Sequence, residues 1–452
     1  MKIIIVGDGK IGFALTKRLA MDGHDIVVID RNARVLEESQ QAADIMTVQG
    51  SGASMDVLKE AGIQNADLLI AATSSDEINI LCCMMASKIS DVHTIARVRS
   101  PEYSKQLNFL KKEMGLSMTF SPEQETAQEI FHLLQFPSFL KRDRFANGRV
   151  EIVEIKVTKD SVLCSQPLKK LNELVKVRVL VCAVERDNTA YIPSGNFVLE
   201  ENDNIYVTAV SRELSQLVKN LGLVRERVKQ ALIIGGSRSS FYLSNRLISA
   251  GVLVKIIERD SNRCAELSAM LPKATIICGD GSRQEVLSEV GIDNADALIT
   301  LTDIDEENLI ISLFAAQRGV PKVITKVNRE EYIDTFQNFG IDTFINPKQL
   351  SCSDIVRYVR AMENTTGGSM QALHYIVGGR VEALEFFADN TTDNLQIPLK
   401  DLQLKPNILI ASINRSGHII IPSGVDFIQA GDTVVVVAKA QQAIYDLNDI
   451  FA

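Results

Sequence analysis

The chain has 452 residues, with 48 lysines and arginines against 57 aspartates and glutamates, which gives a formal net charge of −9. This balance argues against a general affinity for nucleic acid, which needs clustered basic side chains to replace the counterions of the phosphates. The length fits roughly three domains of about 150 residues. A content of 46% hydrophobic and 23% charged residues is typical of a folded globular protein and excludes a disordered chain.

We expect neither a membrane span nor a metal site. No run approaches the roughly 18 apolar residues that a transmembrane helix needs, and the opening MKIIIVGDGKIG predicts a strand instead of a secretory signal. The 7 cysteines and 5 histidines form no cluster with the spacing of metal ligands. We therefore expect a cytosolic protein whose thiols are reduced, buried and structural.

A duplication organises the chain. IIIVGDGKIG at 3–12 is matched by ALIIGGSRSS at 231–240, and AGIQNADLLIAAT is matched by VGIDNADALITLT. The tetrapeptide IPSG occurs at 192–195 and again at 421–424, and each copy precedes an acidic residue and a strand-like run. Two kinds of domain therefore alternate, and we name them N1, C1, N2 and C2. Their predicted boundaries are 1–136, 137–224, 225–365 and 366–452, with a charged hinge at 225–230.

The N domains alternate short apolar runs with helical patterns. In the first copy the strands are expected at 2–6, 25–30, 44–49, 67–73 and 93–99. The helices between them are expected at 13–23, 54–62 and 78–88. Apolar strands that alternate with helices predict an α/β fold, a Rossmann-like doubly wound parallel sheet with right-handed crossovers.

The C domains differ in their pattern. Alternating strands at 150–157 and 179–186, with turn residues between them and little helix, predict a small α+β domain with an antiparallel sheet. A helix is expected at 122–136, where it would lead from N1 into C1.

Three glycines of N1 form a dinucleotide-binding fingerprint. Gly7, Gly9 and Gly12 directly follow an apolar strand and open a helix, which is the context that gives the GxGxxG pattern its meaning. Gly7 permits a tight turn, Gly9 lets the backbone approach a pyrophosphate, and Gly12 lets the helix pack closely on the strand. The free N–H groups at the start of the helix would bind the phosphates.

An acidic residue stands where a ribose is expected. Asp30 ends the second strand, roughly 20 residues after the fingerprint, where a carboxylate can accept hydrogen bonds from ribose hydroxyls. It favours NAD over NADP, although the neighbouring Arg31 could tolerate a 2′-phosphate. The alternative is a doubly wound domain that has lost its ligand.

The second copy of the fingerprint is altered. Gly235 matches Gly7, but Ser237 and Ser240 replace the other two glycines and would crowd a pyrophosphate. Glu258 keeps an acid at the end of the second strand, and Asp280 adds another carboxylate. N2 therefore binds a different and smaller adenine nucleotide, or none.

Further polar residues follow the strands at the expected ligand edge. Thr73 and Ser74 end one strand, Thr302 opens the matching segment of N2, and Arg97 in the next strand could pair with a phosphate. Lys326 is the counterpart of Arg97. For each of them the alternative is a capping residue or an exposed salt bridge.

We expect no catalysis. A hydride-transfer enzyme needs an acid–base residue held near the nicotinamide, and the sequence offers no His/Asp, Tyr/Lys or Ser/His/Asp constellation. None of the histidines recurs at the matching place in the other half.

Over essentially its whole length the chain resembles the family of peripheral subunits of bacterial Trk potassium uptake systems, which are built of RCK (or KTN) domains. The likeness is carried by GDGKIG (7–12), Asp30, QGSG (49–52), NADLLIAATSSDEIN (65–79) and ARVRSPEY (96–103), and by the paired IPSG motifs. It implies a cytosolic ring, peripheral at the inner face of the cell membrane, beneath a membrane-embedded potassium channel subunit. It also implies binding of NAD(H) and of ATP or ADP, and a homotetramer formed as a dimer of dimers.

The resemblance also assigns residues. Residue by residue it implies that the dinucleotide in N1 contacts Gly7, Asp8, Gly9, Lys10 and Ile11. It implies the same for Asp30, Thr73, Ser74 and Arg97. The helix at 122–136 would carry motion from N1 to C1. Two alternatives remain: an NAD-dependent oxidoreductase of duplicated architecture, and a ligand-sensing module of another cation transporter.

Overall fold

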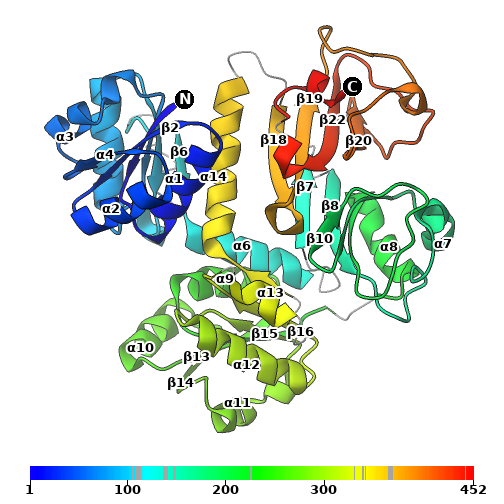
Figure 1. Ribbon diagram of the computed structural model, residues 1–452. Helices are drawn as coiled ribbons and strands as arrows, with labels where there is room; N and C mark the ends of the chain where they lie inside the picture. Colours follow the sequence, from blue (N-terminus) through cyan, green and yellow to red (C-terminus); the bar gives the residue numbers. More distant parts are fainter. Residues whose placement is uncertain are drawn as a thin grey trace. The chain divides into compact units, whose positions relative to one another are not determined.

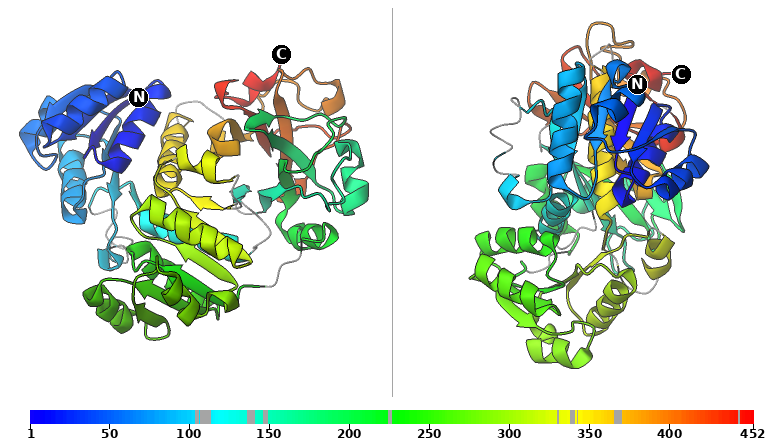
Figure 2. Two further views of the ribbon diagram at one scale, coloured as in Figure 1. Left: turned by 60° about the horizontal axis from the view of Figure 1, so that its bottom comes forward. Right: turned by 90° about the vertical axis from the view of Figure 1, so that its left-hand side faces the viewer.

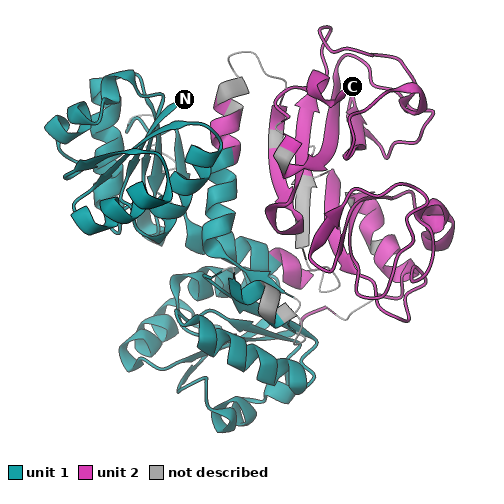
Figure 3. Cartoon of the chain, viewed as in Figure 1, with its two compact units in different colours: residues 1–131, 229–356 teal, residues 132–228, 357–452 magenta. Residues whose placement is uncertain are grey.

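The structure is a computed structural model, and it describes residues 1–103, 106, 114–135, 141–145, 149–223, 227–329, 331–337, 341, 343–364, 370–442 and 444–452. The chain forms two compact units (Figure 3). Unit 1 comprises Met1–Phe131 and Lys229–Val356, and unit 2 comprises His132–Val228 and Arg357–Ala452. Each unit therefore holds both copies of one kind of domain. The four domain boundaries predicted from the sequence stay predictions, and part of the predicted hinge, 225–226, lies outside the described residues.

The first sheet of unit 1 is a six-stranded parallel sheet in the order β3-β2-β1-β4-β5-β6 (Figure 1). Its strands are β1 (Lys2–Val6), β2 (Asp25–Asp30), β3 (Met46–Gln49), β4 (Leu68–Ala71), β5 (His93–Arg97) and β6 (Met118–Phe120). Its helices are α1 (Lys10–Met21), α2 (Ala33–Ala42), α3 (Met55–Glu60), α4 (Asp76–Ile89) and α6 (Pro122–Gln135). The order reverses between β1 and β4, which makes this edge the topological switch point where doubly wound sheets bind ligands.

The second sheet of unit 1 repeats this topology in the order β14-β13-β12-β15-β16-β17. Its strands are β12 (Gln230–Ile234), β13 (Leu253–Glu258), β14 (Thr275–Cys278), β15 (Ala297–Thr300), β16 (Lys322–Lys326) and β17 (Phe344–Ile345). Its helices are α9 (Arg238–Ser249), α10 (Ser261–Met270), α11 (Gln284–Val290), α12 (Asp305–Gln317), α13 (Glu331–Gln337) and α14 (Pro347–Asn364). Helices flank both faces of each sheet (Figure 2), so the predicted α/β fold is confirmed.

Burial explains why these runs form central strands. Every residue of β4 and all but the first of β1 are buried, as expected for strands covered on both faces. Gly23 follows α1 with a φ of +87°, and its N–H donates to the carbonyl of Ala20 at 3.0 Å. A glycine carries this left-handed conformation without steric cost, so the helix ends here and β2 can begin.

Unit 2 contains two five-stranded antiparallel sheets, in the orders β10-β9-β11-β8-β7 and β18-β19-β22-β20-β21. The elements of C1 are β7 (Lys141–Phe145), β8 (Val150–Lys156), α7 (Leu171–Val175), β9 (Leu180–Arg186), β10 (Thr189–Tyr191), β11 (Asn204–Val210) and α8 (Leu214–Asn220). Those of C2 are β18 (Met370–Ile376), β19 (Val381–Phe387), β20 (Ile408–Arg415), β21 (His418–Ile420) and β22 (Asp432–Lys439). The two sheets share a core of buried residues from both domains.

The repeated acidic residue of the C domains has a structural role. Asp203 is buried and accepts hydrogen bonds from Nε and an Nη of Arg186, both at 2.7 Å. Asp432 is buried and accepts the equivalent pair from Arg415 at 3.0 and 2.8 Å. This bidentate geometry satisfies a charge that would be costly to bury alone.

Some elements differ from the sequence-based expectation. The short strands β6, β7 and β17 were missed, because runs of two to five residues carry little periodicity. The expected burial of every cysteine was wrong for Cys278, which is exposed because it ends the edge strand β14, and Cys164 and Cys352 are only partly buried. Within the described ranges no helix has the length and hydropathy to span a membrane. The same ranges hold no group of three or more metal-ligating side chains.

Candidate functional site

The turn between β1 and α1 is shaped by its glycines. Gly7 has a φ of +90°, and a Cβ there would lie 2.8 Å from the backbone of Thr73. A Cβ at Gly12 would lie 1.9 Å from the carbonyl oxygen of Gly7, so α1 can approach β1 this closely only with glycine. Gly9 precedes the first helical residue and has open space around it, and no side chain caps the helix there. The first N–H groups of α1 are therefore available to an anion.

Asp30 is positioned by the same turn. Its carboxylate accepts hydrogen bonds from the backbone N–H of Asp8 at 2.8 Å and of Asn32 at 2.8 Å. Asp8 itself is buried, where it accepts a short hydrogen bond from Ser39. Burial raises the pKa of the Asp8 carboxyl, which the nearby Asp30 raises further against the lowering effect of Ser39. Asp8 thus lies beneath the turn and braces it.

Thr73 is clamped by an asparagine of α4. Asn79 is fully buried, and its oxygen accepts from the backbone N–H of Thr73 at 2.8 Å and from its hydroxyl at 2.7 Å. The same amide donates to the carbonyl of Arg97 at 3.0 Å. In N2, Asn308 makes the equivalent bonds to Thr302 and Lys326. These contacts hold the carboxyl ends of two neighbouring strands together in each copy.

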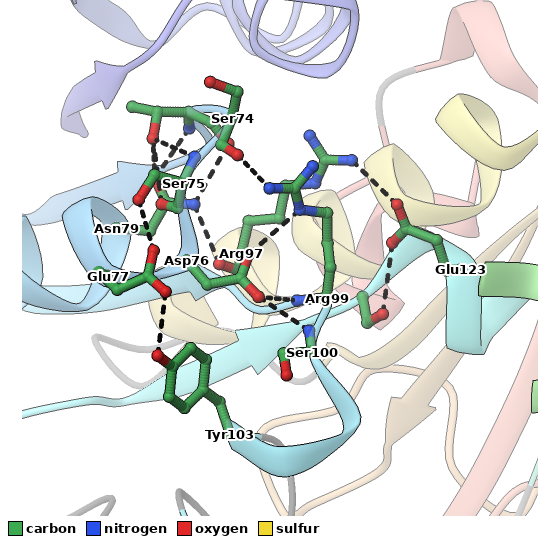
Figure 4. Close-up of polar contacts among 12 residues, drawn as sticks. Ser74, Ser75, Asp76, Glu77, Asn79, Arg97, Arg99, Ser100, Tyr103 and Glu123 are labelled. Carbon is green, nitrogen blue, oxygen red and sulfur yellow. Dashed lines mark hydrogen bonds and ion pairs between the residues drawn. The ribbon is translucent and has the colours of Figure 1, made fainter. Parts of the chain in front are cut away.

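A second buried carboxylate organises the loop after β5 (Figure 4). Asp76 accepts from the backbone N–H groups of Arg99 and Ser100, each at 2.8 Å, and from the Arg99 side chain at 3.1 Å. The Arg99 guanidinium also donates a short bond to the carbonyl of Ser74. This network was not predicted from the sequence, although its residues lie in DEIN (76–79) and ARVRSPEY (96–103), two of the segments that carry the family resemblance. It fixes Ser74 at the ligand edge.

Arg97 lies beside the switch point and forms an ion pair with Glu123 of α6, with 3.3 Å between nitrogen and oxygen (Figure 4). Burial lowers the pKa of the Arg97 guanidinium, an effect that Glu123 opposes. Within the described residues its Nε has no hydrogen-bond acceptor. Arg97 therefore forms a largely buried ion pair instead of the exposed salt bridge of the alternative, while part of the guanidinium keeps capacity for an anion.

The carboxyl edge of the first sheet encloses a cavity of about 620 Å³, within the range of small-molecule sites. Of the predicted residues it is lined by Gly7, Gly9, Lys10, Ile11, Asp30, Arg31, Thr73, Ser74 and Arg97. Asp8 and Gly12 lie outside the lining and support the turn. The missed lining residues include Gly50, Ser51, Gly52, Ile78 and Glu123. The arrangement combines free helix N–H groups and five cationic side chains with three carboxylates, among them Asp30, and so suits a phosphorylated ligand with a ribose.

The corresponding cavity of N2 is smaller, about 230 Å³, and it is lined by Gly235, Glu258, Asp280 and Thr302 among others. Glu258 repeats Asp30, because it accepts from the N–H of Gly236 at 2.6 Å and of Asp260 at 2.8 Å. Ser237 differs from Gly9, since its hydroxyl caps α9 by accepting from the N–H of Ser240 at 3.3 Å. The Ser240 hydroxyl donates to the carbonyl of Gly235 at 2.5 Å. A side chain therefore occupies part of the anion position in N2.

Two protein-family models each match this chain twice, in agreement with the duplication. The TrkA-N domain model matches residues 3–122 and 231–347, and the TrkA-C domain model matches residues 152–222 and 395–451. The Trk system potassium uptake protein TrkA of Vibrio alginolyticus is 31% identical, with 100% of this chain and 98% of that protein covered. TrkA homolog 1 of Methanosarcina mazei is 30% identical, with 98% of each chain covered.

Solved structures share the fold. The GsuK RCK domain superposes with a TM-score of 0.65 at 18% identity, covering 97% of this chain and 92% of that one. The GsuK channel bound to NAD superposes with a TM-score of 0.62 at 18% identity, covering 97% and 77%. At this identity the likeness establishes the RCK fold of both halves and nothing further.

Proposed function

This chain belongs to the TrkA family of potassium uptake proteins, and we propose that it is a regulatory subunit that binds NAD(H) and ATP or ADP and gates a membrane-embedded potassium transporter. It would act in the cytoplasm, as a peripheral homotetramer at the inner face of the cell membrane, and not as an enzyme. The observation that carries the proposal is the N1 cavity, which brings nine of the predicted residues to one edge of the sheet.

The residues present fit a dinucleotide. The free N–H groups at the start of α1 would take the pyrophosphate, and the absence of a Cβ at Gly9 leaves room for its approach. Asp30 would accept hydrogen bonds from the adenosine ribose while it holds the turn. Arg97 would add positive charge at the switch point. The NAD-bound GsuK channel has the same fold, which agrees with this assignment.

Regulation by such a ligand requires two conformations with different affinities, because a ligand shifts an equilibrium only by its differential binding. Helix α6 begins beside the cavity, where Pro122 and Glu123 line it, and continues into unit 2 beyond Phe131. A change in the Arg97–Glu123 ion pair on binding would therefore act directly on the start of α6. If substitutions in 122–135 left nucleotide-dependent transport unchanged, this route would be wrong.

Calorimetric titration of the full chain with NADH, NAD, ATP and ADP tests the proposal. We expect about one NAD(H) bound per chain, weakened at least tenfold by Asp30→Ala. Glu258→Ala is the matched control, since it removes the equivalent carboxylate of N2 and should leave this affinity unchanged. Binding that Glu258→Ala removes and Asp30→Ala spares would place the ligand in N2. No binding by the wild type would refute the proposal.

Two further measurements separate the alternatives. Oxidation of NADH in the presence of candidate metabolites would favour an oxidoreductase, whereas a regulatory subunit gives binding without turnover. Light scattering of the purified chain measures its mass, and we expect four chains per particle. A monomer at micromolar concentration would contradict the proposed ring.

A further inference from the structure

The N1 cavity is not built by N1 alone. Six residues of N2 belong to its lining, and they are Ser239, Asp303, Lys326, Asn328, Pro347 and Lys348. They come from the carboxyl edge of the second sheet and from the start of α14. Both N domains lie in unit 1, and the hydroxyl of Tyr242 donates to the carbonyl of Arg99 at 2.9 Å to tie the two edges together.

The two halves differ in charge at this edge. In N1 the second residue of α6, Glu123, neutralises Arg97. In N2 the second residue of α14 is Lys348, and Lys326 forms its ion pair with Asp303 instead, with 2.9 Å between nitrogen and oxygen. The Arg97–Glu123 pair of N1 is thus replaced in N2 by two cations and one carboxylate, and Lys326, Lys348 and Asp303 all line the cavity of the other domain.

Both lysines keep hydrogen-bonding capacity. Lys348 Nζ donates to the carbonyl of Asn328 at 3.0 Å. Lys326 Nζ donates to the carbonyl of Thr302 at 3.1 Å and to Asp303 at 2.9 Å. The bond from Lys326 holds the pKa of Asp303 below its usual range, and Lys10 of N1 adds to this effect. An ammonium has three donors, so each lysine can make a further bond to an anion.

We infer that N2 completes the nucleotide site of N1, with Lys348 and Lys326 binding the terminal phosphates of a nucleoside triphosphate whose adenosine lies in N1. This inference rests on the proposed function of the N1 cavity. N2 would then contribute to nucleotide binding even if its own turn, which Ser237 caps, binds no ligand.

The charge of the cavity favours a polyphosphate. Its described lining holds five cationic side chains, Lys10, Arg31, Arg97, Lys326 and Lys348. The anionic ones are Asp30, Glu123 and Asp303. The turn at 7–12 would take the phosphates nearest the ribose, and the two lysines of the opposing domain would take the terminal phosphates. A mononucleotide would therefore bind N1 without engaging N2, while a triphosphate would hold the two domains together.

Titration of the full chain with ATP, ADP and AMP tests this inference. In Lys348→Gln we expect the Kd for ATP to rise about tenfold and the Kd for AMP to change less than twofold. Lys326→Gln should act in the same direction. Lys348→Arg should restore most of the ATP affinity, because it keeps the charge. Lys273→Gln, at an exposed position of N2 outside the lining, controls for the loss of one positive charge.

The outcomes are distinguishable. Equal affinity of wild type and Lys348→Gln for ATP would overturn the inference and leave nucleotide binding by N1 intact. Equal weakening of ATP and AMP would also overturn it, since the lysine would then not sense the terminal phosphates. Absence of binding of any nucleotide to the wild type would instead refute the proposed function. Thermal unfolding of each variant without ligand identifies any that fail to fold.

Discussion

The two N domains share a scaffold and differ in what their turns leave open. Asp30 and Glu258 each hold the N–H that follows the first glycine, at 2.8 and 2.6 Å. Asn79 and Asn308 clamp the next two strands in the same way. Yet the start of α1 has no side-chain cap, whereas Ser237 caps α9. A serine hydroxyl at the start of the helix can therefore take the N–H groups that a phosphate would otherwise bind. The fold is kept, but the phosphate site is lost.

The largest expected effect comes from giving N1 the residue of N2. In Gly12→Ser the new Cβ would meet the carbonyl oxygen of Gly7, so α1 must shift away from β1. We expect a loss of about 1–3 kcal/mol of stability and at least a hundredfold weaker NADH binding. Calorimetry and thermal unfolding measure both.

The reverse exchange, Ser240→Gly, is its control. It removes the hydroxyl that bonds Gly235 and should cost about 1 kcal/mol without changing the affinity of N1. An unchanged NADH affinity in Gly12→Ser would show that this difference between the two turns does not decide nucleotide binding.

A buried acid distinguishes the two crossover helices. Glu125 is the fourth residue of α6, where α14 has Leu350. It accepts from the Ser351 hydroxyl at 2.5 Å, and burial, together with the charges of Asp354 and Glu123, raises its pKa to about 7 against the opposing hydrogen bonds from Ser351 and Ser121. Because the folded pKa exceeds the unfolded one, Glu125 stabilises the fold below about pH 4.5, and this stabilisation is lost as the pH rises to about 7.

We therefore expect Glu125→Gln to be more stable than the wild type at pH 8, by about 1–3 kcal/mol. The difference should shrink as the pH falls towards 4.5, because the folded Glu125 is then protonated and as neutral as glutamine. Urea unfolding at the two pH values measures it, and Glu60→Gln on the exposed end of α3 is the control. A difference that does not depend on pH would show that folding does not raise the pKa of Glu125.

The smallest effect is expected at the cap of α9. Ser237→Ala removes the hydroxyl that accepts from Ser240 and should cost about 1 kcal/mol. Gly9→Ala in N1 removes no cap and meets no neighbouring atom, so its effect on stability should be smaller and its effect on NADH affinity larger. Thermal unfolding with and without NADH measures both. Equal behaviour of the two variants would mean that the turns are equivalent after all.

The fold could be predicted from the sequence because the features that indicate its strands and turns lie within short segments of the chain. Apolar runs, the glycine turn and the duplication locate most strands of the parallel sheets. The same signals identified nine lining residues of the N1 cavity, and the family resemblance supplied some of these. They could not identify Glu123 or Lys348, because these approach the cavity from helices that follow the last strand of each sheet. Nor could they show that residues of N2 line the N1 cavity, because sequence patterns do not indicate which domains pack against each other.

Asp303 lies in the lining of both cavities. A substitution there changes the potential felt in each half at once, so the halves are not free to diverge independently at this position. Here the two copies remain electrostatically linked, because one carboxylate belongs to both cavities.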